Sequence, residues 1–300
     1  MVSEEYRVFQ KQMAEALAAA PPPETLADRR ARMETGMGSL PLAPGVEADQ
    51  LDADGVAVVR CRRAEAVDDP VVLYFHGGGY RLGSARTYRA YGSRLALAAA
   101  ATVILVDYRL APEHRFPAAV EDALRSWQWL LSTGVAPGRS VVAGDSAGGG
   151  LAAALLVAAR ERGLPLPAGA VCLSPWADLR NQSASYARCA DSDELFSKQS
   201  ADEAAALYLD GADPAHPLAS PALAAWDGLP PLLIQASSDE VLADDATALA
   251  RAARAGGVDV ERHEWDGMPH VWQLHYPAFP EAVEAVRQVA RFVARVTAGT

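Results

Sequence analysis

The sequence predicts an α/β fold with a mostly parallel central sheet, flanked by helices and carrying a small helical cap. Two observations predict it. Short strands rich in β-branched residues alternate with helical stretches, and most of these strands are apolar at successive positions. Continuous apolar strands are typical of parallel sheets whose two faces are both covered by helices. Active sites on such sheets lie beyond the carboxyl ends of the strands, so the loops there are the place to look for chemistry.

The alternation runs from about residue 48 to the end of the chain. We predict strands at residues 56–59, 71–75, 102–107, 140–144, 168–174, 232–236 and 258–265. We predict helices at residues 86–100, 118–133, 147–162, 243–255 and 278–297. The first strand follows Asp54-Gly55, a dipeptide typical of a hairpin turn.

Two segments fall outside this alternation and predict the cap. Residues 1–40 begin with a helix that carries one apolar stripe, and a second helix is predicted at residues 24–33. The stripe consists of Tyr6, Phe9, Met13 and Leu17, and Pro21-Pro22-Pro23 ends the helix. Periodicity alone does not decide whether the stripe packs in the core or forms a lid over a pocket.

The second of these segments, residues 177–228, holds one clear helix at residues 197–209 among polar, proline-rich loops. We expect it to pack with residues 1–40 as the cap. The core then consists of residues 41–176 and 229–300.

Composition and charge exclude several classes of protein. Half of the 300 residues are apolar and 22% are charged, which is typical of a soluble globular chain. The net charge of −11 argues against nucleic acid and anionic membranes as partners. The start of the chain lacks a signal-peptide pattern, and no apolar run reaches the ~18 residues of a membrane span. Cys61, Cys172 and Cys189 form no zinc or redox pattern, so we predict reduced thiols, a cytoplasmic location and no metal site.

The segment Gly144-Asp145-Ser146-Ala147-Gly148 lies between a predicted strand and a predicted helix. In such a turn the backbone of the central serine is strained, and the flanking glycines let neighbouring backbone pass close by. The strain holds the serine hydroxyl above the sheet, where it can act as a nucleophile. A serine hydroxyl needs a base, an orienting acid and oxyanion donors to react at neutral pH.

Oxyanion donors are predicted in the loop His76-Gly77-Gly78-Gly79, which directly follows the strand at residues 71–75. Successive glycines allow the main chain to approach a ligand with its N–H groups pointing outward. Together with the serine turn, the loop predicts an oxyanion hole made by the N–H groups of Gly77, Gly78 and Ala147. A phosphate-binding loop is excluded because its glycine and lysine pattern does not occur.

The base is predicted to be His270. It lies in a short loop after the strand at residues 258–265, which places its imidazole at the same edge of the sheet as Ser146. The remaining histidines fall in other loops, within a strand or in polar stretches, and have structural explanations. They are His76, His114, His216, His263 and His275.

The orienting acid is predicted to be Asp239, just past the strand at residues 232–236. Its carboxylate would fix the tautomer of His270 and stabilise the imidazolium. Glu240, Asp244 and Asp245 compete for this role. The two aspartates open the next predicted helix, where the helix dipole favours acids, and Glu240 is expected to point away from the direction of its neighbour.

These motifs together resemble the hormone-sensitive-lipase-like esterases, the bacterial family IV carboxylesterases. The resemblance covers about residues 45–300. It rests on Asp107-Tyr108-Arg109-Leu110-Ala111-Pro112-Glu113-His114-Arg115-Phe116-Pro117-Ala118-Ala119, Gly144-Asp145-Ser146-Ala147-Gly148-Gly149, Leu173-Ser174-Pro175-Trp176, Leu218-Ala219-Ser220-Pro221 and Gly267-Met268-Pro269-His270. The chain departs from the family at the acid, where Asp239-Glu240-Val241 stands for the frequent Asp-Pro-Leu. It departs again at Arg81, where an apolar residue is commoner and for which we expect an ion pair.

The resemblance implies an α/β-hydrolase fold, no cofactor, a homodimer formed through the sheet edge, and hydrolysis of short-to-medium acyl esters. Ser146 would attack, His270 would move the proton, and an acyl-enzyme would form. Hydrolysis of a lactone or an acetylated amide by the same triad, and a non-catalytic small-molecule receptor of this fold, are the alternatives. Trp176, Trp272, Leu207, Tyr208 and the apolar stripe are candidate pocket walls, and each fits the core equally well.

Overall fold

The computed structural model describes residues 2–19 and 25–298, and its centre is an eight-stranded sheet. The strands lie in the order β1-β2-β4-β3-β5-β6-β7-β8, and every pair from β4 to β8 is parallel. Their bounds are β1 Val46–Asp52, β2 Ala57–Arg63, β3 Val71–Phe75, β4 Thr102–Val106, β5 Ser140–Asp145, β6 Gly169–Leu173, β7 Leu232–Ser237 and β8 Val260–Trp265. The predicted α/β-hydrolase fold is confirmed.

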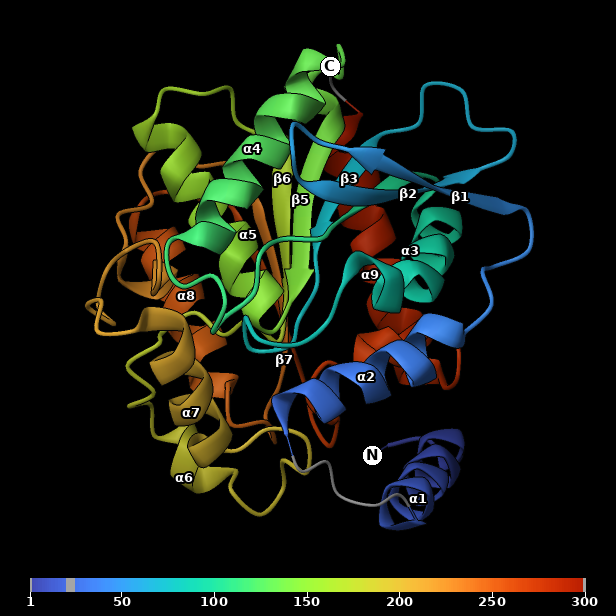
Figure 1. The fold of residues 1–300 in the computed structure, drawn as a ribbon, viewed down its shortest axis with the longest axis vertical. Coiled ribbons are helices and arrows are strands. Elements are labelled where there is room, and N and C mark those ends of the chain that lie inside the picture. Colours follow the sequence, from blue (N-terminus) through green and yellow to red (C-terminus); the bar gives the residue numbers. More distant parts are fainter. Residues whose placement is uncertain (1, 20–24, 299–300) are drawn as a thin grey trace.

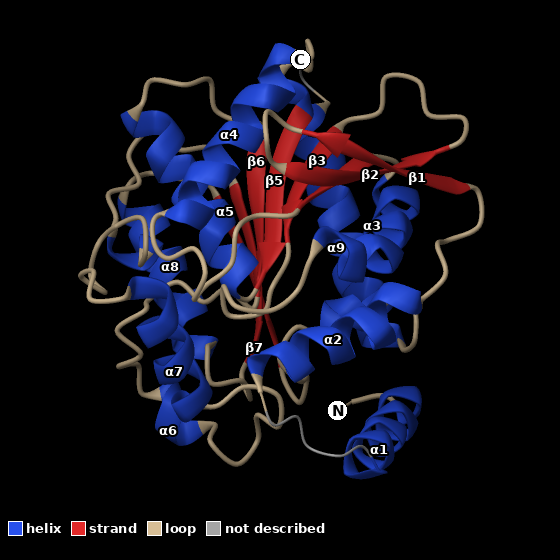
Figure 2. Ribbon diagram, in the orientation of Figure 1, coloured by secondary structure: helices blue, strands red, loops and turns tan. Residues whose placement is uncertain are grey.

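Helices cover both faces of this sheet (Figures 1 and 2). On one face lie α4 (Ala118–Ser132), α5 (Ala147–Glu161) and α8 (Ala243–Ala255), and on the other lie α3 (Ala85–Ala99) and α9 (Pro280–Thr297). The strand β3 shows why both faces need covering. Val71, Leu73 and Phe75 pack in the core under α5, while Val72 and Tyr74 pack in the core under α3. Successive side chains of a strand point to opposite faces, so an apolar run must be buried twice.

The hairpin signal at Asp54-Gly55 is confirmed, because β1 and β2 pair antiparallel on either side of it. The sequence pattern did not predict the strand β1. Of its residues Val46 is buried and the others are half-buried or exposed, because β1 lies at the open edge of the sheet.

The cap elements lie at the end of the sheet where β5 terminates (Figure 1). They are α1 (Glu4–Ala19), α2 (Leu26–Gly36), the short α6 (Ser185–Arg188) and α7 (Lys198–Leu209). Arg30 of α2 ties this layer to the core through Glu113 at 2.7 Å and through the carbonyls of Arg81 and Ala111. The division into core and cap remains a prediction.

Part of the apolar stripe of α1 packs in the core, and part of it lines a cavity, so both predicted alternatives occur. Tyr6 and Phe9 pack on Phe279, the N-cap residue of α9, with ring centroids 5.0 and 5.2 Å away, whereas Met13 lines a cavity. The side chain of Leu17 and the three prolines lie outside the described residues. Within the described ranges, no helix is long and apolar enough to cross a membrane.

Candidate active site

Ser146 is the single residue between β5 and α5, and its backbone is strained. Its φ of 51° and ψ of −121° lie in a region that only glycine adopts easily. Neighbouring backbone holds it there. Its N–H donates to the Leu173 carbonyl at 2.8 Å, and its carbonyl accepts from the Trp176 N–H at 2.9 Å. The side chain is 7% exposed.

The two glycines around Ser146 are required by backbone contacts. A Cβ on Gly144 would lie 2.2 Å from the Gly148 carbonyl oxygen, and one on Gly148 would lie 2.0 Å from the Phe75 carbonyl oxygen. Any side chain there would push β3, β5 and α5 apart. The spacing of the glycines therefore follows from the close crossing of the strand and the helix at the turn.

His270 faces Ser146 across the carboxyl edge of the sheet. Its Nε2 lies 2.9 Å from the serine Oγ. The next residue fixes the loop, since the Val271 N–H donates to the Ser174 hydroxyl at 3.2 Å. The Phe196 ring stacks on the imidazole with centroids 5.6 Å apart and planes inclined by 18°. The structure thus brings the two residues together with the geometry of a nucleophile and its base.

The carboxylate that contacts His270 belongs to Glu240, and the prediction of Asp239 for this place is wrong. Glu240 Oε2 lies 2.8 Å from His270 Nδ1, and Oε1 accepts from the Ser237 N–H at 3.1 Å. Asp239 turns the other way and accepts from the Gly267 N–H and the Ser238 hydroxyl. Adjacent residues after a strand point in different directions, and only the second one reaches the buried imidazole.

A sequence signal for Glu240 was present in the spacing of the following leucine. The family pattern Asp-Pro-Leu places the acid two residues before a leucine. In this chain that leucine is Leu242, so the matching tripeptide is Glu240-Val241-Leu242. The position of the acid in the family pattern thus falls on Glu240, one residue after Asp239.

The environment of His270 adjusts its basicity. Burial lowers the pKa of the imidazole, but the hydrogen bond and the charge of Glu240 outweigh it, so the pKa of His270 is raised above its ordinary value. With Nδ1 facing the carboxylate, Nε2 is the nitrogen that faces Ser146. Glu240 itself is fully buried, so its charge acts with little screening by water.

The glycine loop approaches Ser146 as predicted, but Gly77 is not one of its free donors. The Gly77 N–H is shared between Asp145 Oδ1 and the Tyr88 hydroxyl, both at 3.1 Å, which corrects its place in the predicted oxyanion hole. Gly78 and Gly79, with φ of 118° and 61°, line the cavity beside Ser146. Among the described residues, the N–H groups of Gly78, Gly79 and Ala147 have no hydrogen-bond acceptor.

Asp145 connects the serine turn to the glycine loop. Its carboxyl is buried and accepts from the hydroxyls of Tyr74 and Tyr88, both at 2.9 Å, as well as from Gly77. Burial raises the pKa of Asp145 to about 6, although these hydrogen bonds oppose the shift. A Cβ on Gly77 would lie 2.3 Å from Asp145 Oδ2, so only glycine fits against this carboxyl.

A cavity of about 500 Å³ opens above Ser146 and His270, and both cap segments line it. Its apolar walls are Met13, Met33, Met37, Leu40, Leu82, Leu195, Phe196, Val271 and Leu274. Trp176, Trp272, Leu207 and Tyr208 are not part of its lining. Arg81 lies at its side, 3.7 Å from Glu203 and hydrogen-bonded to Ser200, which is the ion pair expected for it.

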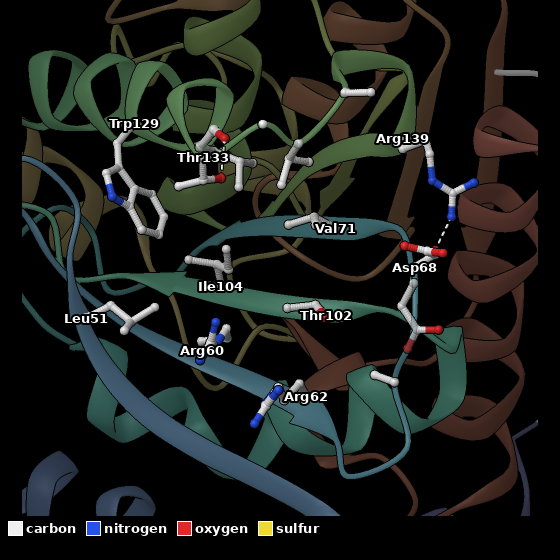
Figure 3. A pocket seen from close by; sticks show the side chains of 16 residues that line it. Leu51, Arg60, Arg62, Asp68, Val71, Thr102, Ile104, Trp129, Thr133 and Arg139 are labelled. Carbon is white, nitrogen blue, oxygen red and sulfur yellow. Dashed lines mark hydrogen bonds between the residues drawn. The ribbon is translucent and has the colours of Figure 1, made fainter.

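Another cavity, of about 520 Å³, lies at the opposite edge of the sheet, where β3 and β4 begin (Figure 3). Arg60, Arg62 and Arg139 line it, but each guanidinium has a partner. Their partners are Asp49, Glu47 and the Asp68 carbonyl, respectively. This cavity is therefore lined by arginines that already have hydrogen-bond or ion-pair partners, and it is remote from the carboxyl edge of the sheet.

Comparisons with known proteins identify the family of this chain. The family model described as alpha/beta hydrolase fold matches residues 72–274. An acetyl-hydrolase of Streptomyces hygroscopicus is 45% identical over 270 residues, covering 89% of this chain and 88% of that protein. An esterase of Acinetobacter venetianus is 35% identical, over 77% and 76% of the two chains.

A solved esterase of the bacterial hormone-sensitive lipase family superposes with a TM-score of 0.93 at 45% identity, over 99% of both chains. The chain belongs to the hormone-sensitive-lipase-like α/β hydrolases. Membership of this family makes it a carboxylic ester hydrolase.

Gly148→Ala is expected to destabilise the protein by about 1–3 kcal/mol, because the new methyl group overlaps the Phe75 carbonyl. Displacement of the glycine loop should also lower kcat on the order of 10–100-fold. Urea unfolding and ester hydrolysis measure the two effects. Gly36→Ala is the matched control, since a Cβ there meets nothing within 4 Å. Equal stability of the two variants would contradict the close-crossing argument.

Proposed function

We propose that the chain is a serine carboxylesterase for short-to-medium acyl esters, acting through Ser146, His270 and Glu240 and an acyl-enzyme intermediate. The observation that carries this proposal is the continuous chain of contacts from Ser146 Oγ to His270 Nε2 at 2.9 Å and from Nδ1 to Glu240 at 2.8 Å. In this proposal Glu240 takes the role that was predicted for Asp239.

In the first step, Ser146 Oγ attacks the ester carbonyl carbon and its proton moves to His270 Nε2. The carbonyl oxygen becomes an oxyanion and accepts from the N–H groups of Gly78, Gly79 and Ala147. Such donors are aimed at charge that develops only in the transition state, and each contributes about 2.7–4 kcal/mol. The tetrahedral species then collapses, the C–O bond to the alcohol breaks, and His270 returns the proton to the leaving oxygen.

In the second step, water replaces the alcohol. His270 takes a proton from this water, the hydroxide attacks the acyl carbon, and the same N–H groups stabilise the second oxyanion. Collapse breaks the bond to Ser146, which recovers its proton from His270. Glu240 keeps its charge throughout, holds the imidazole in one orientation and stabilises the imidazolium.

The size and lining of the cavity support the substrate class. About 500 Å³ of largely apolar space above Ser146 suits an acyl group of a few carbons together with its alcohol. Two relatives are named acetyl-hydrolase or putative acetyl-hydrolase, which favours the short end of the acyl series. That name also keeps an acetylated amide as the second candidate substrate.

The proposal is tested by initial rates on p-nitrophenyl esters from acetate to palmitate, with p-nitroacetanilide as the amide. We expect the highest kcat/KM at short chains and a loss on the order of 10⁴-fold or more in Ser146→Ala. Cleavage of the anilide alone would support the second candidate. Activity unchanged in the Ser146→Ala variant would exclude this mechanism.

Glu240→Gln is expected to reduce kcat by roughly 10²–10⁴-fold, because a neutral amide neither fixes the imidazole tautomer nor stabilises the imidazolium. Asp239→Asn changes the neighbouring carboxylate in the same way and should retain activity within about threefold, since it still accepts from Gly267. Steady-state kinetics on p-nitrophenyl butyrate compares them. The reverse order of damage would restore Asp239 as the acid.

The pH profile of kcat/KM should fall on the acid side as His270 becomes protonated, because a protonated imidazole cannot accept the serine proton. Since Glu240 raises the pKa of His270, the midpoint should lie above the ordinary value of about 6.5. Glu240→Gln should move the midpoint to lower pH. An identical midpoint in both proteins would show that Glu240 does not act on the imidazole.

A further inference from the structure

A second cavity, of about 400 Å³, lies next to the catalytic one between α1 and the loops that carry Asp239 and Gly267. Met13, Leu195 and His275 line both cavities and separate them. Met13 and Leu195 are 37% and 47% exposed, so this partition consists of flexible side chains at the surface. The mechanism proposed above does not use the second cavity.

The walls of this cavity combine aromatic and apolar surface with negative charge. Tyr6, Phe9, Met13 and Met268 supply the apolar part, and the carboxylates are those of Asp191, Glu194 and Asp239. Among the residues that the structure describes, neither lysine nor arginine lines this cavity. Burial lowers the pKa of His275 to about 4, so this imidazole is neutral near pH 7 and offsets none of the charge.

Tyr6 gives an independent sign that a polar group is received here. Its side chain is 4% exposed and lines the cavity, yet its hydroxyl has no hydrogen-bond partner among the described residues. The pKa of this phenol is raised to about 12, first by burial and then by the charges of Glu194, Glu281 and Asp239. The hydroxyl oxygen therefore lies in the negative field of the cavity carboxylates and is free to accept an N–H.

Asp191 and Glu194 are also unsatisfied. Both carboxylates are exposed, and within the described part of the chain neither has an ion-pair partner. Asp239 is half-buried and already accepts from Gly267. The two free charges thus stand beside an aromatic floor, an arrangement that attracts a cation with an organic body.

The cations of the site lie on the other side of the partition. Arg29 and Arg81 line the catalytic cavity and do not line the second one. Of the carboxyls in the described part of the chain, Asp145 alone lines the catalytic cavity, and it is held by three hydrogen bonds. Charge therefore changes sign from one cavity to the other across Met13, Leu195 and His275.

We propose that the second cavity binds an organic ammonium group, which faces Asp191 and Glu194 and packs on Tyr6 and Phe9. When the ammonium is the far end of an ester whose carbonyl lies at Ser146, the inference rests on the proposed function. The same chemistry can be supplied by a separate amine. In both cases a carboxylate in the same place is repelled.

Three ethyl esters of similar length test whether the ammonium belongs to the substrate: ethyl 6-aminohexanoate, ethyl hexanoate and monoethyl adipate. Their hydrolysis is measured at pH 7 by the release of acid. We expect kcat/KM to decrease in that order, with most of the difference in KM. The ratio of the ammonium ester to the neutral ester should fall about 3–10-fold in the double variant Asp191→Asn/Glu194→Gln. It should also fall as salt is raised, because the two carboxylates are exposed.

Glu161→Gln is the matched control, since it removes an exposed carboxylate at the end of α5, outside both cavities. It should leave the ratio unchanged. Asp239 is not varied here because its carboxylate already accepts from the Gly267 N–H. The neutral ester reports on the proposed function separately: failure to cleave it refutes the esterase without affecting the next measurement.

Titration calorimetry of benzylamine into the Ser146→Ala variant tests binding without turnover. Binding should weaken when Asp191→Asn/Glu194→Gln is added to this variant, and it should not weaken when Glu161→Gln is added. This result supports the ammonium site even if the three esters are cleaved alike. In that case the ligand of the site is a separate amine. The proposal is overturned if benzylamine does not bind and the ester ratio is the same in the double variant. Preference for monoethyl adipate overturns it as well.

Discussion

The buried carboxyl of Asp145 is the contact on which the geometry of the site depends. It precedes Ser146 in the strained turn and accepts from Tyr74, Tyr88 and Gly77. One side chain therefore fixes the glycine loop relative to the nucleophile. A carboxyl that is removed from water needs such donors, since an unpaired one would cost several kcal/mol. All three donors are present. The hydrogen bonds that stabilise the buried carboxyl of Asp145 therefore also position Gly78 and Gly79.

Close backbone contacts supply the second constraint. The turn at Ser146 brings α5 against the end of β3, with room for glycine alone at Gly144 and Gly148. The strain at Ser146 is stored there and is maintained by the bonds to Leu173 and Trp176. The rigid sheet thus keeps the hydroxyl at 2.9 Å from His270 before any substrate arrives. Preorganisation of this kind removes the cost of ordering the groups during the reaction.

The cap determines what can reach this geometry. Residues from α1, α2 and the segment around α7 line the cavity above Ser146, and Phe196 of that segment stacks on the imidazole of His270. Asp193 accepts from the Val241 N–H at 2.9 Å, next to Glu240, whose carboxylate contacts His270. Phe196 and Asp193 therefore link this segment to His270 and to the residue beside Glu240, so changes in its loops alter the shape of the cavity and the surroundings of His270 together.

The sequence by itself determined the fold, and it was enough to single out the turn at Ser146, the glycine loop and His270 as candidates. These features depend on local rules: apolar runs form buried strands, and glycines are needed where backbones cross. The tertiary structure alone decided between Asp239 and Glu240, because the choice depends on which carboxylate points at an imidazole 30 residues away. It also decided that the Gly77 N–H is consumed by Asp145, a contact over 68 residues. Side-chain direction and long-range burial are not encoded in local spacing, and they set both outcomes.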